Sequence, residues 1–199
     1  MNLDFAQQYI LERLSQELAP HLTYHHINHT LSVTERALQI AQSEGVTNKE
    51  SILLLRTAAL YHDSGFLISY DNHEYFSCQI VEEILPQFEY NNAQILQITE
   101  MIKATKIPQS PHDLLAKILC DADLDYLGGT GYYPTVASLF EELKYYGKMT
   151  SADNWIQVQI DFLTKHRYFT QTNQKERSLE KEKRVNELRL SIRSFDNRP

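Results

Sequence analysis

The sequence predicts an all-α protein, a single compact helical bundle with additional helices toward its C-terminal end. Apolar residues recur every three or four positions along most of the 199 residues, which is the period of one face of an α-helix. No segment shows the alternation of apolar and polar residues that a half-buried strand requires. Glycine is also scarce, with six residues in the chain. These observations favour helices joined by short loops.

Apolar stripes and end signals place the expected helices. Thr47 and Glu50 have the spacing of a capping box, which predicts a helix start, while Pro20 and Gly45 are typical of positions just past a helix end. Helices are therefore expected over about residues 5–18, 31–45, 47–62, 73–85, 92–106, 111–127, 135–146, 152–166 and 170–194.

Two loops interrupt this helical pattern, over residues 64–72 and 128–134, and the second contains three glycines and Pro134. The last expected helix carries charges on nearly all sides, so we interpret it as a solvated terminal helix, with the contact of a homodimer as the alternative. No repeat or clear linker divides the chain. We therefore expect one domain over residues 1–199.

Composition and charge narrow the function classes. Hydrophobic residues make up 42% and charged residues 23%, which is the mix of a globular protein. The two cysteines, Cys78 and Cys120, form no Cys-x-x-Cys pair, and neither a signal peptide nor a run long enough to span a membrane is found. We expect a cytoplasmic protein without a membrane partner. The net charge of −7 argues against a nucleic acid polymer as partner, although a metal ion would let an acidic protein bind a small phosphate.

Histidines are concentrated before the second expected helix, where four of the eight lie at positions 21, 25, 26 and 29. On a helix, His25 and His29 would share a face, because they are four residues apart. Val33 and Ala37 continue that face, so His29 should point into the fold. A buried imidazole needs a partner for each ring nitrogen, and a metal ion can serve one of them.

Two further segments place polar side chains beside apolar helices. His62 and Asp63 end the strongly apolar run LLLRTAALYHD, two residues before Gly65. A second His-Asp pair, His112-Asp113, follows a proline among polar residues, and we interpret it as a helix start.

The segment LLAKILCDADLDYLGG carries three aspartates on an apolar helix. Asp121 and Asp125 share one face of this helix, whereas Asp123 lies on the other. At least one carboxylate must therefore face the protein interior. A buried aspartate is costly unless it is paired or bound to a metal.

The order His, His-Asp, Asp resembles the HD-domain superfamily of metal-dependent phosphohydrolases. The resemblance implies that His29, His62, Asp63 and Asp123 bind a divalent metal ion, with Asp123 preferred to Asp121 because Ala-Asp-Leu matches the last motif of the family. Mixed nitrogen and oxygen ligands suit Mn, Fe, Co, Ni or Zn, and Mg less well. The resemblance covers an HD-type core over about residues 21–130, followed by a C-terminal helical extension over about 131–199.

The opening motif Tyr24-His25-x-x-x-His29 is similar to the start of the cyclic-nucleotide phosphodiesterase domain. This similarity implies that His25 is the general acid for the leaving oxygen, with His26 as the competing candidate. Asp63 would also accept a proton from the attacking water. The chain departs from phosphodiesterases in its shorter length and in lacking their downstream glutamine motif.

Other residues are candidates for weaker reasons. His73 is a candidate ligand for a second metal, or simply the start of a helix after an Asn cap. Thr105 and Lys106 are candidates for phosphate binding, with a surface lysine at a helix end as the alternative. Tyr126 and His26 are candidates for substrate binding, although most tyrosines near a site serve packing.

Together the motifs predict a metal-dependent hydrolase of phosphoesters, acting on a small phosphorylated substrate of nucleotide or cyclic-nucleotide type. The alternative is a regulatory HD protein that binds nucleotide and metal without turnover.

Overall fold

The computed structural model describes residues 1–149, 151 and 154–196, which form nine α-helices and three short 3-10 helices and contain no strand. The predicted all-α fold class is thereby confirmed. In chain order the elements are α1 (Leu3–Glu17), α2 (Ile27–Ser43), α3 (Lys49–Tyr61), η1 (Ser64–Leu67), α4 (His73–Ile84), η2 (Leu85–Phe88), α5 (Asn92–Thr105), α6 (Leu114–Asp123), η3 (Asp125–Gly128), α7 (Tyr132–Tyr145), α8 (Trp155–Lys165) and α9 (Gln171–Asp196).

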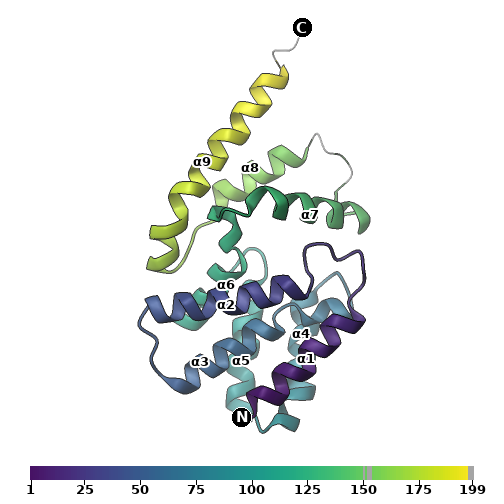
Figure 1. Ribbon diagram of the computed structural model, residues 1–199, viewed down its shortest axis with the longest axis vertical. Coiled ribbons are helices and arrows are strands. Elements are labelled where there is room, and N and C mark those ends of the chain that lie inside the picture. Colours follow the sequence, from purple (N-terminus) through teal and green to yellow (C-terminus); the bar gives the residue numbers. More distant parts are fainter. Residues whose placement is uncertain (150, 152–153, 197–199) are drawn as a thin grey trace.

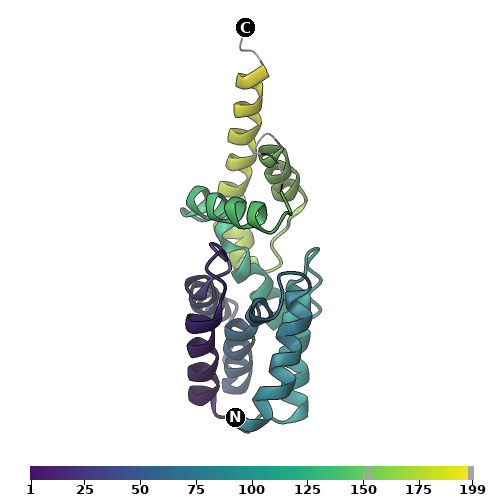
Figure 2. The same cartoon turned by 90° about the vertical axis from the view of Figure 1, so that its right-hand side faces the viewer.

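Two clusters of buried apolar side chains lie along the molecule. The larger one is enclosed by α1 to α6, which form the lower body in Figure 1, and it includes Ile10, Leu55 and Leu119. The smaller one begins at Leu124 and joins η3 to α7, α8 and α9, which form the upper body. The last turns of α9 project beyond the other helices in both views (Figures 1 and 2).

Several helix ends differ from the predicted ones because another polar residue supplies the cap. The N-cap of α3 is Asn48 rather than Thr47, and its side chain accepts a hydrogen bond from the Ser51 amide at 2.9 Å. Asp113 caps α6 by accepting from the Ala116 amide at 2.8 Å, so this helix starts after the second His-Asp pair. The first helical turn of α7 includes Pro134, which the sequence placed in a loop.

Other predicted boundaries also shift. Helix α6 ends at Asp123, and a separate 3-10 turn, η3, follows where the sequence predicted continuous helix to residue 127. The predicted loop after Asp63 contains another such turn, η1. The expected helix start at Ala152 lies outside the described residues, and α8 is described from Trp155 onward.

The terminal helix α9 is not solvated on all sides, so that prediction is wrong for one of its faces. Val185 and Leu188 are buried in the smaller cluster and Asn173 is buried where it donates to Asp121 and Asp125, whereas Leu179 and Leu190 are exposed. This buried face could not be recognised in the sequence, because two of its charged residues, Lys181 and Arg184, are themselves largely buried. No described helix is both long and apolar enough to cross a membrane.

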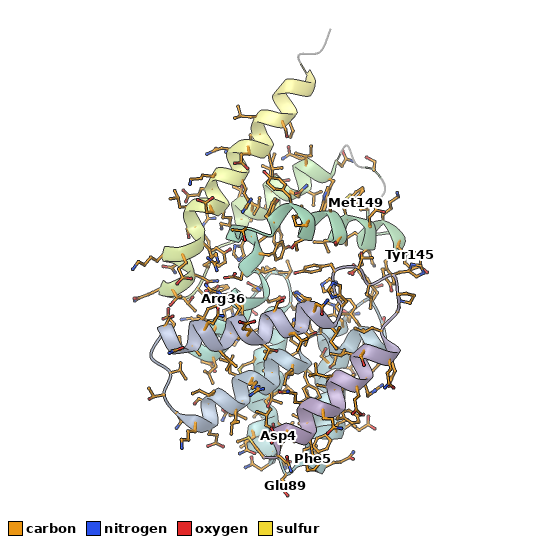
Figure 3. All side chains as sticks on the ribbon, in the orientation of Figure 1. Asp4, Phe5, Arg36, Glu89, Tyr145 and Met149 are labelled. Atoms are coloured by element: carbon orange, nitrogen blue, oxygen red, sulfur yellow. The ribbon has the colours of Figure 1, made fainter. Side chains whose placement is uncertain are left out.

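Polar side chains of α6 and η3 fasten α9 to the lower body. The buried carboxylate of Asp121 accepts hydrogen bonds from the Phe169 amide at 2.9 Å and from the Thr170 amide and hydroxyl at 2.8 and 2.6 Å. Asp125 binds Arg36 of α2 and Arg177 of α9, with nitrogen–oxygen distances of 2.7 and 2.9 Å. Arg36 lies where α2 faces the upper helices (Figure 3).

We predict that Asp121→Ala lowers the free energy of unfolding by about 2–4 kcal/mol, because it leaves two buried donors and one partly buried donor without their acceptor. Chemical denaturation measures this change. The control is Asp161→Ala, since Asp161 is an exposed residue of α8 whose carboxylate, among the described residues, accepts only from Gln157. Equal effects of the two substitutions would contradict the anchoring role of Asp121.

Candidate metal centre

Four side chains from the ends of three helices meet inside the lower body. His29 lies in the first turn of α2, His62 and Asp63 follow the last residue of α3, and Asp123 is the last residue of α6. The Nε2 atom of His29 lies 3.3 Å from Asp63 Oδ2 and 3.2 Å from Asp123 Oδ1. The Nε2 atom of His62 lies 3.2 and 3.6 Å from the same two oxygens. All four side chains are at most 16% exposed.

The chain after α3 is held in place by hydroxyl groups and by a close backbone contact. Ser77 of α4 donates a hydrogen bond to the carbonyl of His62 at 2.7 Å and accepts one from the Gly65 amide at 2.7 Å. A Cβ atom at Gly65 would overlap the carbonyl of His73, so glycine permits α4 to pack directly on this turn. The packing fixes Asp63 and brings His73 beside it.

The donor set fits a divalent transition metal. Nδ1 of His62 contacts the Ala59 carbonyl at 2.8 Å, which fixes the tautomer and leaves Nε2 free to bind a cation. His29 Nε2, His62 Nε2 and Asp63 Oδ2 are buried and make no hydrogen bond of good geometry within the described residues. Ligand atoms of His29, His62 and Asp123 lie within 4.8 Å of one another. Two imidazoles and carboxylates at such distances could hold one ion.

The charges in this cluster depend on one another. Burial would lower the pKa of His62 and of His29, but the carboxylates of Asp63 and Asp123 outweigh burial and raise both. Burial would likewise raise the pKa of Asp63, yet the two imidazoles hold it well below its usual value. A divalent cation would take the place of the protons that balance these carboxylates.

The segment that contains all four side chains matches a known protein family. Residues 26–125, half of the chain, match the model of the HD domain. The chain belongs to the HD-domain family. Members of the HD superfamily are usually metal-dependent hydrolases. The predicted resemblance to this superfamily is therefore confirmed.

A crystal structure of a predicted HD superfamily hydrolase from an uncultured Thermotogales bacterium shares the fold. It is 22% identical, with a TM-score of 0.57, over 98% of this chain and 91% of that one. The structural similarity thus extends beyond the matched HD domain into the C-terminal helices. No curated protein matches the chain.

His25 lies in the site, although not in the way the sequence suggested. Helix α2 begins at Ile27 with His26 as its N-cap, so His25 precedes the helix and does not share a helical face with His29. The side chain of His26 instead accepts a hydrogen bond from the Asn28 amide at 3.1 Å. The rings of His25 and His29 still lie 5.8 Å apart between centroids.

Sequence reasoning missed Glu142, a fully buried residue of α7. One of its oxygens contacts Nδ1 of His25, and the other accepts the amides of Tyr24 and His25 at 2.9 and 3.0 Å. Burial would raise the pKa of Glu142, but His25 and these amides lower it. The signal in the sequence that could have identified Glu142 is a carboxylate beside Leu139 and Leu143 on an apolar helix face.

Among the weaker candidates, His73 and Thr105 reach the site and Lys106 does not. His73 Nε2 lies 3.6 Å from Asp63 Oδ1, and its ring stacks on Phe66. The Thr105 hydroxyl already donates to the Ile102 carbonyl at 2.8 Å. Lys106 is exposed, with Nζ 3.5 Å from Asn72. A second metal at His73 stays a prediction.

Two cavities meet at the cluster, and Tyr24, Asp123 and Tyr126 line both of them. The polar cavity, of about 670 Å³, is bounded by α2, the chain from η3 to α7, and α9. It includes His26 and His29. The apolar cavity, of about 270 Å³, is bounded by η3, α7 and α8, and it includes His25, Asp63, His73 and Thr105.

We predict that Asp63→Asn weakens the binding of Mn²⁺ or Zn²⁺ by more than about tenfold, since even the loss of a residue that only supports a ligand costs that much. Isothermal titration calorimetry measures the affinity, and circular dichroism checks the fold. The other His-Asp pair offers a matched control, Asp113→Asn, because asparagine also caps helices well. Equal metal affinity in the two variants would remove Asp63 from the site.

Proposed function

We propose that this HD protein hydrolyses a small phosphoester with a divalent metal bound by His29, His62, Asp63 and Asp123. The observation that carries the proposal is the position of His25. A histidine held by a buried carboxylate lines the same cavity as two carboxylates of the metal cluster. A proton donor and a cation site beside one cavity are the components that hydrolysis of a phosphoester needs.

The proposed reaction assigns separate roles to the metal, to Asp63 and to His25. When bound, the metal would lower the pKa of a water molecule toward 7 and neutralise phosphate charge. Asp63 accepts a proton from the attacking water, whose oxygen forms the new bond to phosphorus. The bond between phosphorus and the ester oxygen breaks, and His25 donates a proton to that oxygen. One water is consumed, and one alcohol and one phosphate are released.

Glu142 determines which nitrogen of His25 is available. Because its carboxylate contacts Nδ1, that nitrogen carries a hydrogen, and Nε2 is left for the ligand. A protonated His25 can then donate from Nε2 while Glu142 stabilises the imidazolium. The same carboxylate accepts the two backbone amides, and so it also fixes the chain before α2.

The similarity of the Tyr24-His25 opening to phosphodiesterases favours a substrate of nucleotide or cyclic-nucleotide type. The alternative is a regulatory protein that binds such a ligand without turnover. Phosphate release or ester cleavage in the presence of Mn²⁺, Co²⁺, Ni²⁺, Zn²⁺ or Mg²⁺ separates the two. Metal-dependent turnover that EDTA abolishes supports the enzyme, and saturable binding without turnover supports the regulator.

We predict that His25→Ala retains the metal but slows hydrolysis by about 10²–10⁴-fold, the usual contribution of a positioned acid. The loss should shrink for p-nitrophenyl esters, because their leaving group needs little protonation. His26→Ala is the comparison, since His26 caps α2 through Asn28 and lines the polar cavity but not the cavity that holds His25. A larger loss of rate in His26→Ala than in His25→Ala would reverse the assignment of the acid.

Glu142→Gln should slow hydrolysis by about 10²-fold, because an amide group does not fix the tautomer of His25 or stabilise its charged form. The rate should also become more sensitive to the leaving group, as in His25→Ala. The neighbouring Glu141 is exposed, so Glu141→Gln is a matched control. If both variants keep the wild-type dependence on the leaving group, Glu142 does not act through His25.

A further inference from the structure

The apolar cavity has a reactive end and a hydrophobic end. At the reactive end lie His25, Asp63, His73 and Asp123. Beyond them the wall is built from side chains of η3, α7 and α8, and of the short link after α6. These include Leu124, Leu127, Leu139, Leu143, Phe162 and Leu163. A ligand at the cluster therefore extends into a hydrocarbon-lined space supplied by the C-terminal helices.

Two polar side chains that line this cavity, Gln159 and Thr105, are already engaged in hydrogen bonds. Gln159 accepts a hydrogen bond from the Tyr132 hydroxyl at 2.9 Å and donates one to the Trp155 carbonyl at 3.3 Å. The hydroxyl of Thr105 donates to a backbone carbonyl of its own helix. Neither lysine nor arginine is among the described residues that line the cavity. The cavity thus offers no cation for a second phosphate, and the hydroxyl of Tyr24, which is buried without a hydrogen-bond partner among the described residues, belongs to the reactive end, where its ring packs on His25.

The polar cavity has the opposite character. It is lined by Arg36 and Arg177 together with Asp125, Glu176 and Glu180, and His25 is not part of its wall. A general acid must lie within hydrogen-bond reach of the oxygen that it protonates. Because His25 faces the apolar cavity, the leaving oxygen and the group attached to it belong there.

We propose that the alcohol released by this enzyme is apolar, so that the substrate is an alkyl or aryl phosphoester rather than the nucleotide that the Tyr24-His25 motif favours, because the lining of the cavity outweighs the similarity of a short motif. This inference rests on the proposed hydrolysis. An apolar cavity of roughly 150 Å³ is enough to hold benzene, so 270 Å³ accommodates a substituted ring or a short alkyl chain. The ester oxygen takes its proton from His25, and the hydrocarbon stays in the cavity as the alcohol forms.

The surroundings of the cavity agree with entry of an apolar group. Ile107, in the chain after α5, and Val158, in α8, line the cavity and are 52% and 41% exposed. Large aliphatic side chains are thus presented to solvent where the cavity opens. They would contact the hydrocarbon part of a substrate as it enters.

Trp155, the single tryptophan of the chain, lines the cavity and reports on its contents. We would titrate the Mn²⁺-loaded protein with methylphosphonate, hexylphosphonate and AMP while recording tryptophan emission. Each methylene that leaves water tightens binding by about fourfold. Hexylphosphonate should therefore bind about 100-fold or more tightly than methylphosphonate, and more tightly than AMP. Equal affinities for the two phosphonates, or tighter binding of AMP, would overturn the proposal.

A variant of the wall gives a second measurement. Leu139→Gln should reduce the advantage of hexylphosphonate over methylphosphonate by about tenfold, while methylphosphonate binds as in the wild type. The control is Leu96→Gln, because Leu96 is an exposed leucine of α5 outside the cavity. An unchanged advantage in a folded Leu139→Gln protein would contradict the assignment of the cavity.

Hydrolysis assays distinguish a failure of this inference from a failure of the proposed function. Hexyl phosphate and AMP are compared by phosphate release under the same conditions. A lower KM for hexyl phosphate that Leu139→Gln raises supports both statements. Turnover of AMP with the lower KM overturns the apolar leaving group and leaves phosphoester hydrolysis standing. Selective binding of hexylphosphonate without any turnover of esters overturns hydrolysis, and with it the assignment of the cavity to a leaving alcohol.

Discussion

Two imidazoles and two carboxylates converge in the interior of an apolar helical bundle, and this costly arrangement constrains the structure around it. Carboxylates out of water require a cation, and unpaired ring nitrogens require a partner. A divalent metal satisfies both needs at one point. The ends of α2, α3 and α6 must then meet within a few ångströms, which explains the tight packing of Gly65 on α4 and the hydroxyl of Ser77 that fixes the carbonyl of His62.

The C-terminal helices complete the site. The family match ends at residue 125, yet Glu142 on α7 holds His25, and α7 and α8 form most of the apolar wall. The link between α8 and α9 is attached to the lower body by the buried Asp121, which lies only two residues from Asp123 on the opposite side of the same helix. One short segment thus contributes a carboxylate to the candidate metal centre and fastens the chain that leads from α8 into α9.

The sequence allowed the helices and the residues of the His-Asp cluster to be predicted because both leave local signals. Helical periodicity marks the elements, and the His-Asp pair at the end of an apolar run marks a polar group that must be satisfied. The N-cap of α3 was less predictable. Thr47 and Asn48 are both residue types that cap helices well, and the backbone conformation of the folded chain places Asn48 at the cap. Glu142 was missed because its partner His25 lies 117 residues away, a pairing that follows from tertiary packing alone.

Anomalous diffraction from crystals grown with zinc would locate an ion bound by this cluster. We expect one peak at the zinc edge within about 2.0–2.2 Å of Nε2 of His29 and His62 and of a carboxylate oxygen of Asp63 and of Asp123. The absence of a peak there, with the two imidazoles hydrogen-bonded directly to the carboxylates, would contradict this expectation.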